Sequence, residues 1–177
     1  MTLSGTLTSA LPDGSGVSVQ FQNTGVVIDQ ITFNADCVPI AYRLTFNGPA
    51  TFTPMQSGLL EVWAAQAAAA AATSDSFAVT FSNFRIVQNT AANPITVTMT
   101  GNMTSDCFGG TLGLSTFTPI AVAAGQLCPA AGALDVTGGG TTARITYDLG
   151  AVTVDPDNGP AQPYPSCLDP ALLTCSG

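Results

Sequence analysis

The stretch SFAVTFSNFRIV (76–87) alternates apolar and polar side chains, and ITVTMTGNMTS (95–105) follows it after the turn-like NTAANP. Alternation with a period of two is typical of a β-strand, and β-branched and aromatic residues favour that conformation. Similar runs recur along the chain, separated at short intervals by turn signals such as PDGSG, TGGGT and PDNGP. The pattern predicts an all-β protein, either a sandwich or another layered β fold.

One segment has a different composition. The stretch EVWAAQAAAAAATSD (61–75) contains eight alanines, and alanine has the highest helix propensity of all residues. Ser57 suits an N-cap, and Glu61 would lie near the positive end of the helix dipole. We therefore expect one short Ala-rich helix near 58–72, which connects β layers and packs against a sheet because so short a helix is marginal alone.

Length and internal similarity bear on the domain organisation. A chain of 177 residues fits a single β-rich domain spanning 1–177. TLSGTLTS (2–9) aligns with TMTGNMTS (98–105) and shares its glycine, and VQFQNTGVV (19–27) aligns with VTFSNFRIV (79–87) and shares its asparagine. Two interpretations remain: Thr-rich strands that are alike by chance, or two related β layers with a seam at 54–76.

The charge composition excludes several classes of partner. Only 8% of the residues are charged, the net charge is −8, and three arginines are the only cationic side chains. A nucleic-acid-binding protein needs a basic stripe to neutralise phosphates, so we expect no nucleic-acid partner. No apolar run reaches the roughly 20 residues of a membrane-spanning helix. The first residues lack the pattern of a signal peptide, so any export signal would lie upstream of this sequence.

The residues needed for catalysis are scarce. The chain has no histidine and no lysine, so the usual bases for a Ser or Cys nucleophile are missing. Ten of the eleven acidic residues are aspartates, and most of them lie beside turn residues, where a turn role is the default. The sequence therefore predicts a protein that is not an enzyme.

Two kinds of binding site are candidates. Asp148, Asp155, Asp157 and Asn158 lie in DLGAVTVDPDNGP (148–160), and hard oxygen ligands on a turn suit Ca²⁺. The same residues also fit an ordinary solvated turn, and the EF-hand spacing is absent; no other cofactor is expected. A sugar-stacking surface is the second candidate, and its aromatic residues would be Trp63, Tyr42 and Tyr164.

The five cysteines favour an oxidising compartment. Four of them lie beside turn residues, a placement that suits disulfides in exported proteins: Cys107, Cys128, Cys167 and Cys175. Four cysteines allow three pairings, of which we expect Cys107–Cys128 and Cys167–Cys175. Cys37 is then left over, either as a buried free thiol or as a link between subunits.

Three stretches of the C-terminal half carry a resemblance: SDCFGGTLGLSTFTPI, AGQLCPAAGALDVTGGGTTARITYDLGAVTVD and YPSCLDPALLTC. In these stretches, within residues 95–177, the sequence resembles exported bacterial surface proteins that are β-rich, carry disulfides and have no assigned role. The resemblance implies a secreted or surface-attached β module with disulfides and no assigned reaction.

Together these features predict a structural, non-enzymatic protein located outside the cell or on its surface. Strands with few charges leave edges that can pair with another subunit, so the expected partner is a second copy of the chain. The form would be a self-assembling fibre or pilus-like filament joined by β-strand addition, with the polar strand 2–9 as donor. The alternative is a secreted module that binds carbohydrate or Ca²⁺.

Overall fold

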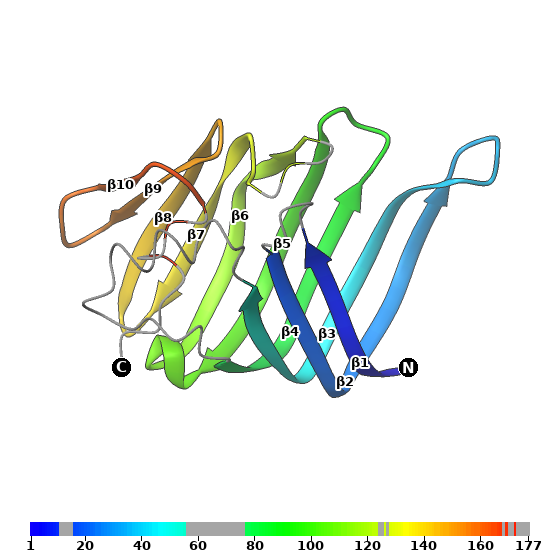
Figure 1. The fold of residues 1–177 in the computed structure, drawn as a ribbon, viewed down its shortest axis with the longest axis horizontal. Helices are drawn as coiled ribbons and strands as arrows, with labels where there is room; N and C mark the ends of the chain where they lie inside the picture. Colours follow the sequence, from blue (N-terminus) through cyan, green and yellow to red (C-terminus); the bar gives the residue numbers. More distant parts are fainter. Residues whose placement is uncertain are drawn as a thin grey trace.

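The computed structural model describes residues 1–10, 16–55, 77–123, 126, 128–167, 169 and 172. In this part of the chain, ten strands form one antiparallel sheet in which each strand pairs with the next along the sequence (Figure 1). A short 3-10 helix, η1 (Asp106–Phe108), lies between β5 and β6. The strands are β1 (Thr2–Ala10), β2 (Gly16–Phe33), β3 (Pro39–Met55), β4 (Phe77–Asn89), β5 (Ile95–Ser105), β6 (Gly110–Val122), β7 (Ala131–Gly138), β8 (Thr141–Asp148), β9 (Ala151–Pro156) and β10 (Gln162–Tyr164).

The prediction of an all-β fold is confirmed. Its sandwich form is not confirmed, because the described strands belong to one continuous hydrogen-bonded sheet. The Ala-rich helix expected near 58–72 lies outside the described residues, as does most of the expected seam at 54–76. The TGGGT segment connects β7 and β8 as a hairpin, in which Gly138 pairs with Thr141.

The sheet bends along one line that crosses its first five strands. β2, β3 and β4 visibly change direction there (Figure 1). The ladders from β1–β2 to β4–β5 all have a register irregularity at this line, and such bulges bend strands. One residue in each strand has a positive φ, and these five residues define the bend line: Gly5, Asn23, Gly48, Asn83 and Gly101.

Glycine and asparagine alternate along the bend line for a steric reason. Gly48 and Gly101 have φ values of 120° and 133°, a region open to glycine, whereas Asn23 and Asn83 lie at 59° and 48°, where asparagine is tolerated. A Cβ on Gly101 would lie 2.5 Å from the carbonyl oxygen of Asn83. Because glycine has no side chain, a strand with glycine at the bend line can approach the bent backbone of the neighbouring strand closely.

Side chains supply hydrogen bonds where the ladder is interrupted. The amide of Asn83 donates to Oδ1 of Asn47 at 2.7 Å, and the amide of Asn23 donates to Oγ of Ser4 at 3.1 Å. The Thr24 side chain is fully buried, and its hydroxyl donates to the carbonyl of Pro49. These bonds satisfy backbone groups that the bulges leave without a ladder partner.

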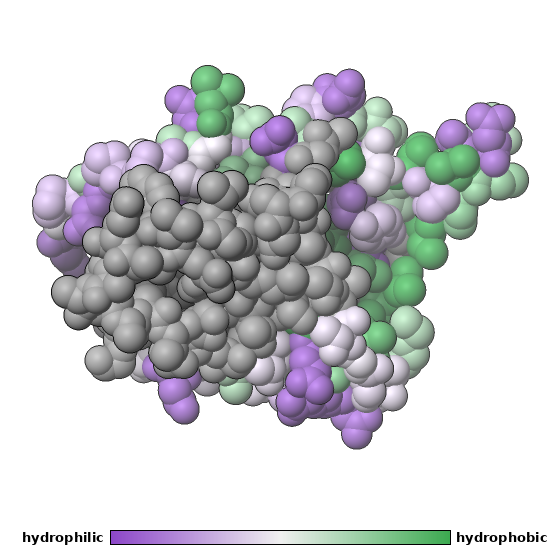
Figure 2. All heavy atoms as spheres, viewed as in Figure 1, coloured by the Kyte–Doolittle hydropathy of each residue, from purple (hydrophilic) through white to green (hydrophobic). Residues whose placement is uncertain are grey.

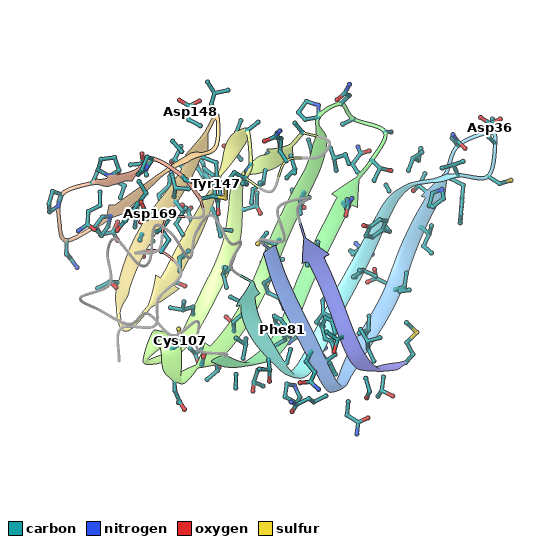
Figure 3. The ribbon with its side chains drawn as sticks, viewed as in Figure 1. Asp36, Phe81, Cys107, Tyr147, Asp148 and Asp169 are labelled. Carbon is teal, nitrogen blue, oxygen red and sulfur yellow. A yellow bond between two sulfur atoms is a disulfide. The ribbon has the colours of Figure 1, made fainter. Side chains whose placement is uncertain are left out.

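The main hydrophobic core lies inside the bend. Phe21 stacks on Phe46 with ring centroids 5.9 Å apart, and Phe46 contacts Phe81 at the same distance. Phe81, labelled in Figure 3, stacks on Phe84 at 5.1 Å, and these two residues flank Asn83 in the sequence. The bend thus turns apolar side chains from both of its sides toward each other. Each aromatic pair stabilises the fold by about 0.5–1.5 kcal/mol in addition to the free energy gained from burying apolar area.

Replacing Gly101 with alanine should destabilise the fold strongly. The positive φ alone costs about 1–3 kcal/mol for a residue with a side chain, and the new Cβ would also clash with the backbone of β4. Gly5→Ala is the matched control, because Gly5 has a similar φ of 141° but open space around its Cβ position. Urea unfolding should show a clearly larger loss for Gly101→Ala; equal losses would contradict the close approach of β4 and β5.

Candidate functional site

β2 and β3 extend beyond their neighbours as a long hairpin. Met1 and Val26 exchange two backbone hydrogen bonds, of 3.0 and 2.8 Å, at the Met1 end of the β1–β2 pair. β2 continues to Phe33, and among the described residues no strand pairs with its outer edge from Val27 to Phe33. We call residues 27–41 the arm, which projects at the right of Figure 1.

The arm exposes several large apolar side chains. Ile31 is 46% exposed and Phe33 is 54% exposed. Figure 2 shows hydrophobic residues gathered along the arm, next to a polar tip. A contiguous apolar group on the surface marks an interaction site more often than single exposed residues do. We define the arm patch as Val27, Ile28, Ile31, Phe33 and Val38.

The charges at the base of the arm neutralise each other. Nε of Arg43 donates to Oδ1 of Asp29 at 2.6 Å. This hydrogen bond, with the charge of Arg43, holds the pKa of the Asp29 carboxyl below its usual value, against a weaker opposing effect of burial. Asp29 therefore stays ionised and paired at neutral pH. The arm presents apolar surface with little net charge, apart from Asp36 at its tip (Figure 3).

The tip of the arm carries the free thiol of Cys37. The side chain of Asn34 shapes this loop, since its Oδ1 accepts from the amides of Asp36 and Val38 at 3.0 and 2.9 Å. Cys37 is exposed and unpaired in the described structure, so the expectation of a buried thiol is wrong. Its role as a link between subunits stays a prediction.

The cysteine pairing differs from both expected pairs. Cys128 is bonded to Cys167, with 5.5 Å between their Cα atoms, so Cys107–Cys128 and Cys167–Cys175 are wrong. Cys107 is disulfide-bonded as well, and Cys175 lies outside the described residues.

The reason for the difference is the extended strand β6, which separates Cys107 from Cys128. β6 has 13 residues, and a strand of that length spans about 40 Å. Cys128 and Cys167 instead meet at the β8–β9 turn: the Gly150 amide donates to Pro129 at 3.0 Å, and the Cys167 amide donates to Gly150 at 2.9 Å. Three connections far apart in the sequence converge there.

The predicted Ca²⁺ ligands are not brought together. Asp148 lies at the β8–β9 turn, at the top of Figure 3. The amide of Asp157 donates to the carbonyl of Thr142 at 2.9 Å, which places Asp157 and Asn158 at the opposite end of β8. Within the described ranges, no group of three or more His, Cys, Asp or Glu residues could hold a metal ion.

The fourth predicted ligand, Asp155, belongs to a row of charged residues across three strands. Arg144 lies opposite Asp135 on one side and Asp155 on the other. It donates to both carboxylate oxygens of Asp135, at 2.7 and 3.0 Å, and lowers the pKa of that carboxyl. Its guanidinium also stacks on Phe117, 3.5 Å from the ring centroid. This row places one arginine between two aspartates on the sheet surface, and sequence spacing alone did not indicate it.

The predicted sugar platform is not assembled from the described aromatic residues. The hydroxyl of Tyr42 on β3 donates to Gln88, and the hydroxyl of Tyr164 on β10 donates to Gln162 at 3.0 Å. These two strands are separated by six others in the sheet, so the rings share no surface. Trp63 lies outside the described residues.

Comparison with protein-family models, with curated proteins and with solved structures gave no match. Among the residues that the structure describes, no helix is long and apolar enough to cross a membrane.

Replacing Cys128 with serine should lower the free energy of unfolding. The bridge spans 39 residues of sequence, and a loop of that length corresponds to about 4 kcal/mol in the chain-entropy model. Thermal unfolding should show a large loss for Cys128→Ser and almost none for Cys37→Ser, which removes only an exposed thiol. Peptide mapping without reductant should recover residues 128 and 167 linked; a Cys107–Cys128 linkage would refute the observed pairing.

Proposed function

We propose that this protein is a structural, non-enzymatic subunit that assembles with copies of itself into a fibre outside the cell or on its surface. The observation that carries the proposal is the arm: a projecting hairpin with an exposed apolar patch and an outer edge that the described residues leave without a partner strand. A monomeric protein gains nothing in stability from leaving such a surface in water.

Two physical properties of the arm support self-association. Unpaired backbone groups on a strand edge accept a further strand, and the neighbouring apolar side chains gain free energy when the partner removes them from water. The pairing of Asp29 with Arg43 also removes a charge that would otherwise repel a second copy of the arm. The same apolar surface on both copies is therefore self-complementary.

Residues 2–9, the expected donor of strand addition, are assigned a different role. Residues 2–9 lie in β1, which pairs with β2 of its own chain in the structure. We therefore assign strand addition to the open edges of β1 and β2 rather than to a detached N-terminal segment. The Cys128–Cys167 disulfide supports an oxidising, extracellular location.

Placing a charge in the arm patch should weaken assembly. Ile31→Lys removes a side chain whose burial contributes about 1.5–3 kcal/mol, so the concentration needed for assembly should rise at least about tenfold. Leu149→Lys is the matched control, because Leu149 is 88% exposed at the β8–β9 turn, away from the arm. Sedimentation velocity and electron microscopy report the size of the assemblies.

Two outcomes would contradict the proposed function. One is wild-type protein that stays monomeric at every concentration. The other is Ile31→Lys protein that assembles at the same concentration as Leu149→Lys.

The tip thiol provides a separate test of how the arms meet. If the arms of two copies lie side by side with their tips at the same end, two Cys37 thiols come within disulfide reach. Wild-type assemblies should then retain covalent dimers in denaturant without reductant, and Cys37→Ser should release monomers. If wild-type chains already separate as monomers under these conditions, Cys37 is not the link between subunits.

A further inference from the structure

The two edges of the sheet differ in their ability to accept another strand. β1 has nine residues, TLSGTLTSA, with no charge and no proline. β10 has three residues, with Pro163 among them and Pro160 and Pro165 close on either side. Proline has no amide hydrogen to donate, so the β10 edge is blocked. β1 has neither a charge nor a proline, and the irregularity of its edge is the register shift between Leu3 and Gly5.

The outer edge of β1 presents backbone groups that the described residues leave without a partner. Met1 and Val26 bond each other, so the backbone of Thr2, one residue further on, points away from β2. Thr2, Ser4 and Thr6 are exposed. Since these side chains are small and uncharged, neither bulk nor charge keeps a second strand away.

We propose that β1 pairs antiparallel with β1 of a second copy about a two-fold axis. The partner follows from the edges: a head-to-tail contact between the two opposite ends of the sheet would need β1 to pair with β10, which is short and interrupted by prolines. Two uncharged β1 edges, by contrast, are self-complementary and place no like charges opposite each other. The inference rests on the proposed function in taking a second copy of the chain as the partner.

The symmetry of this contact determines what it can build. An isologous contact uses the same surface on both copies and therefore closes at a dimer. The arm extends beyond the Met1 end of β1, and antiparallel pairing places the two Met1 ends at opposite ends of the dimer. Each dimer would then carry one arm patch at each end. Alternation of β1 contacts and arm contacts yields an open fibre, whereas either contact alone stops at two copies.

The test combines one variant at each contact. Thr6→Lys puts a charge at the middle of the exposed β1 edge, where two lysines would lie close together in the pair; Thr146→Lys is the control, because Thr146 is exposed on the interior strand β8. In sedimentation velocity, Thr6→Lys alone and Ile31→Lys alone should each stop at dimers. The double variant should be monomeric, and Thr146→Lys should assemble like the wild type.

A second variant keeps the test decisive if Thr6→Lys fails to fold, which circular dichroism would show. Thr2→Pro removes an amide that points away from β2, so it should preserve the fold and block β1 pairing. If folded Thr6→Lys or Thr2→Pro protein forms fibres at the same concentration as Thr146→Lys, the β1 contact is wrong. The proposed function would then still be tested separately, by comparing the assembly of Ile31→Lys with that of Leu149→Lys.

Discussion

The backbone geometry of the bend line is the constraint on which the rest of the structure depends. In five neighbouring strands one residue has a positive φ, outside the ordinary β region, and these residues lie at adjacent positions. Gly101 lies so close to the backbone of Asn83 that a side chain at position 101 would have no space. Bending the sheet turns Phe21, Phe46, Phe81 and Phe84 toward one another, and this cluster is the main apolar core of the described chain. A flat sheet of the same strands would leave these rings on an open surface in water.

The candidate surfaces follow from strand lengths rather than from clusters of reactive side chains. β2 and β3 have 18 and 17 residues, while β1 has nine, and among the described residues no strand pairs with the outer edge of β2 from Val27 to Phe33. At the opposite side, the short proline-flanked β10 ends the sheet. One end of the sheet is thus open and the other closed, and this asymmetry favours contacts between like surfaces over head-to-tail growth.

The sequence similarity within the chain falls on the bend line, although the sequence alone predicts no bend. The aligned octapeptides share Gly5 and Gly101, and the aligned nonapeptides share Asn23 and Asn83, which are four of the five residues of the bend line. The repeated element is therefore a pair of residues suited to positive φ. The same residue types recur at these positions because few residue types tolerate that backbone conformation. The cysteine pairs and the acidic group were misplaced, because distance along the sequence ignores the length of an extended strand.

The sequence by itself determined the strand content and the TGGGT hairpin, because alternation, β-branching and turn residues act over a few neighbouring positions. It also determined what the chain lacks, since no arrangement of strands can supply histidine, lysine or a basic stripe. Only the tertiary structure decided that Cys128 meets Cys167 and that Asp148 lies far from Asp157. Among the described residues, it alone left the outer edge of Val27–Phe33 without a partner strand and Cys37 exposed. These features depend on where separate strands end relative to each other, which is set by register across the whole sheet.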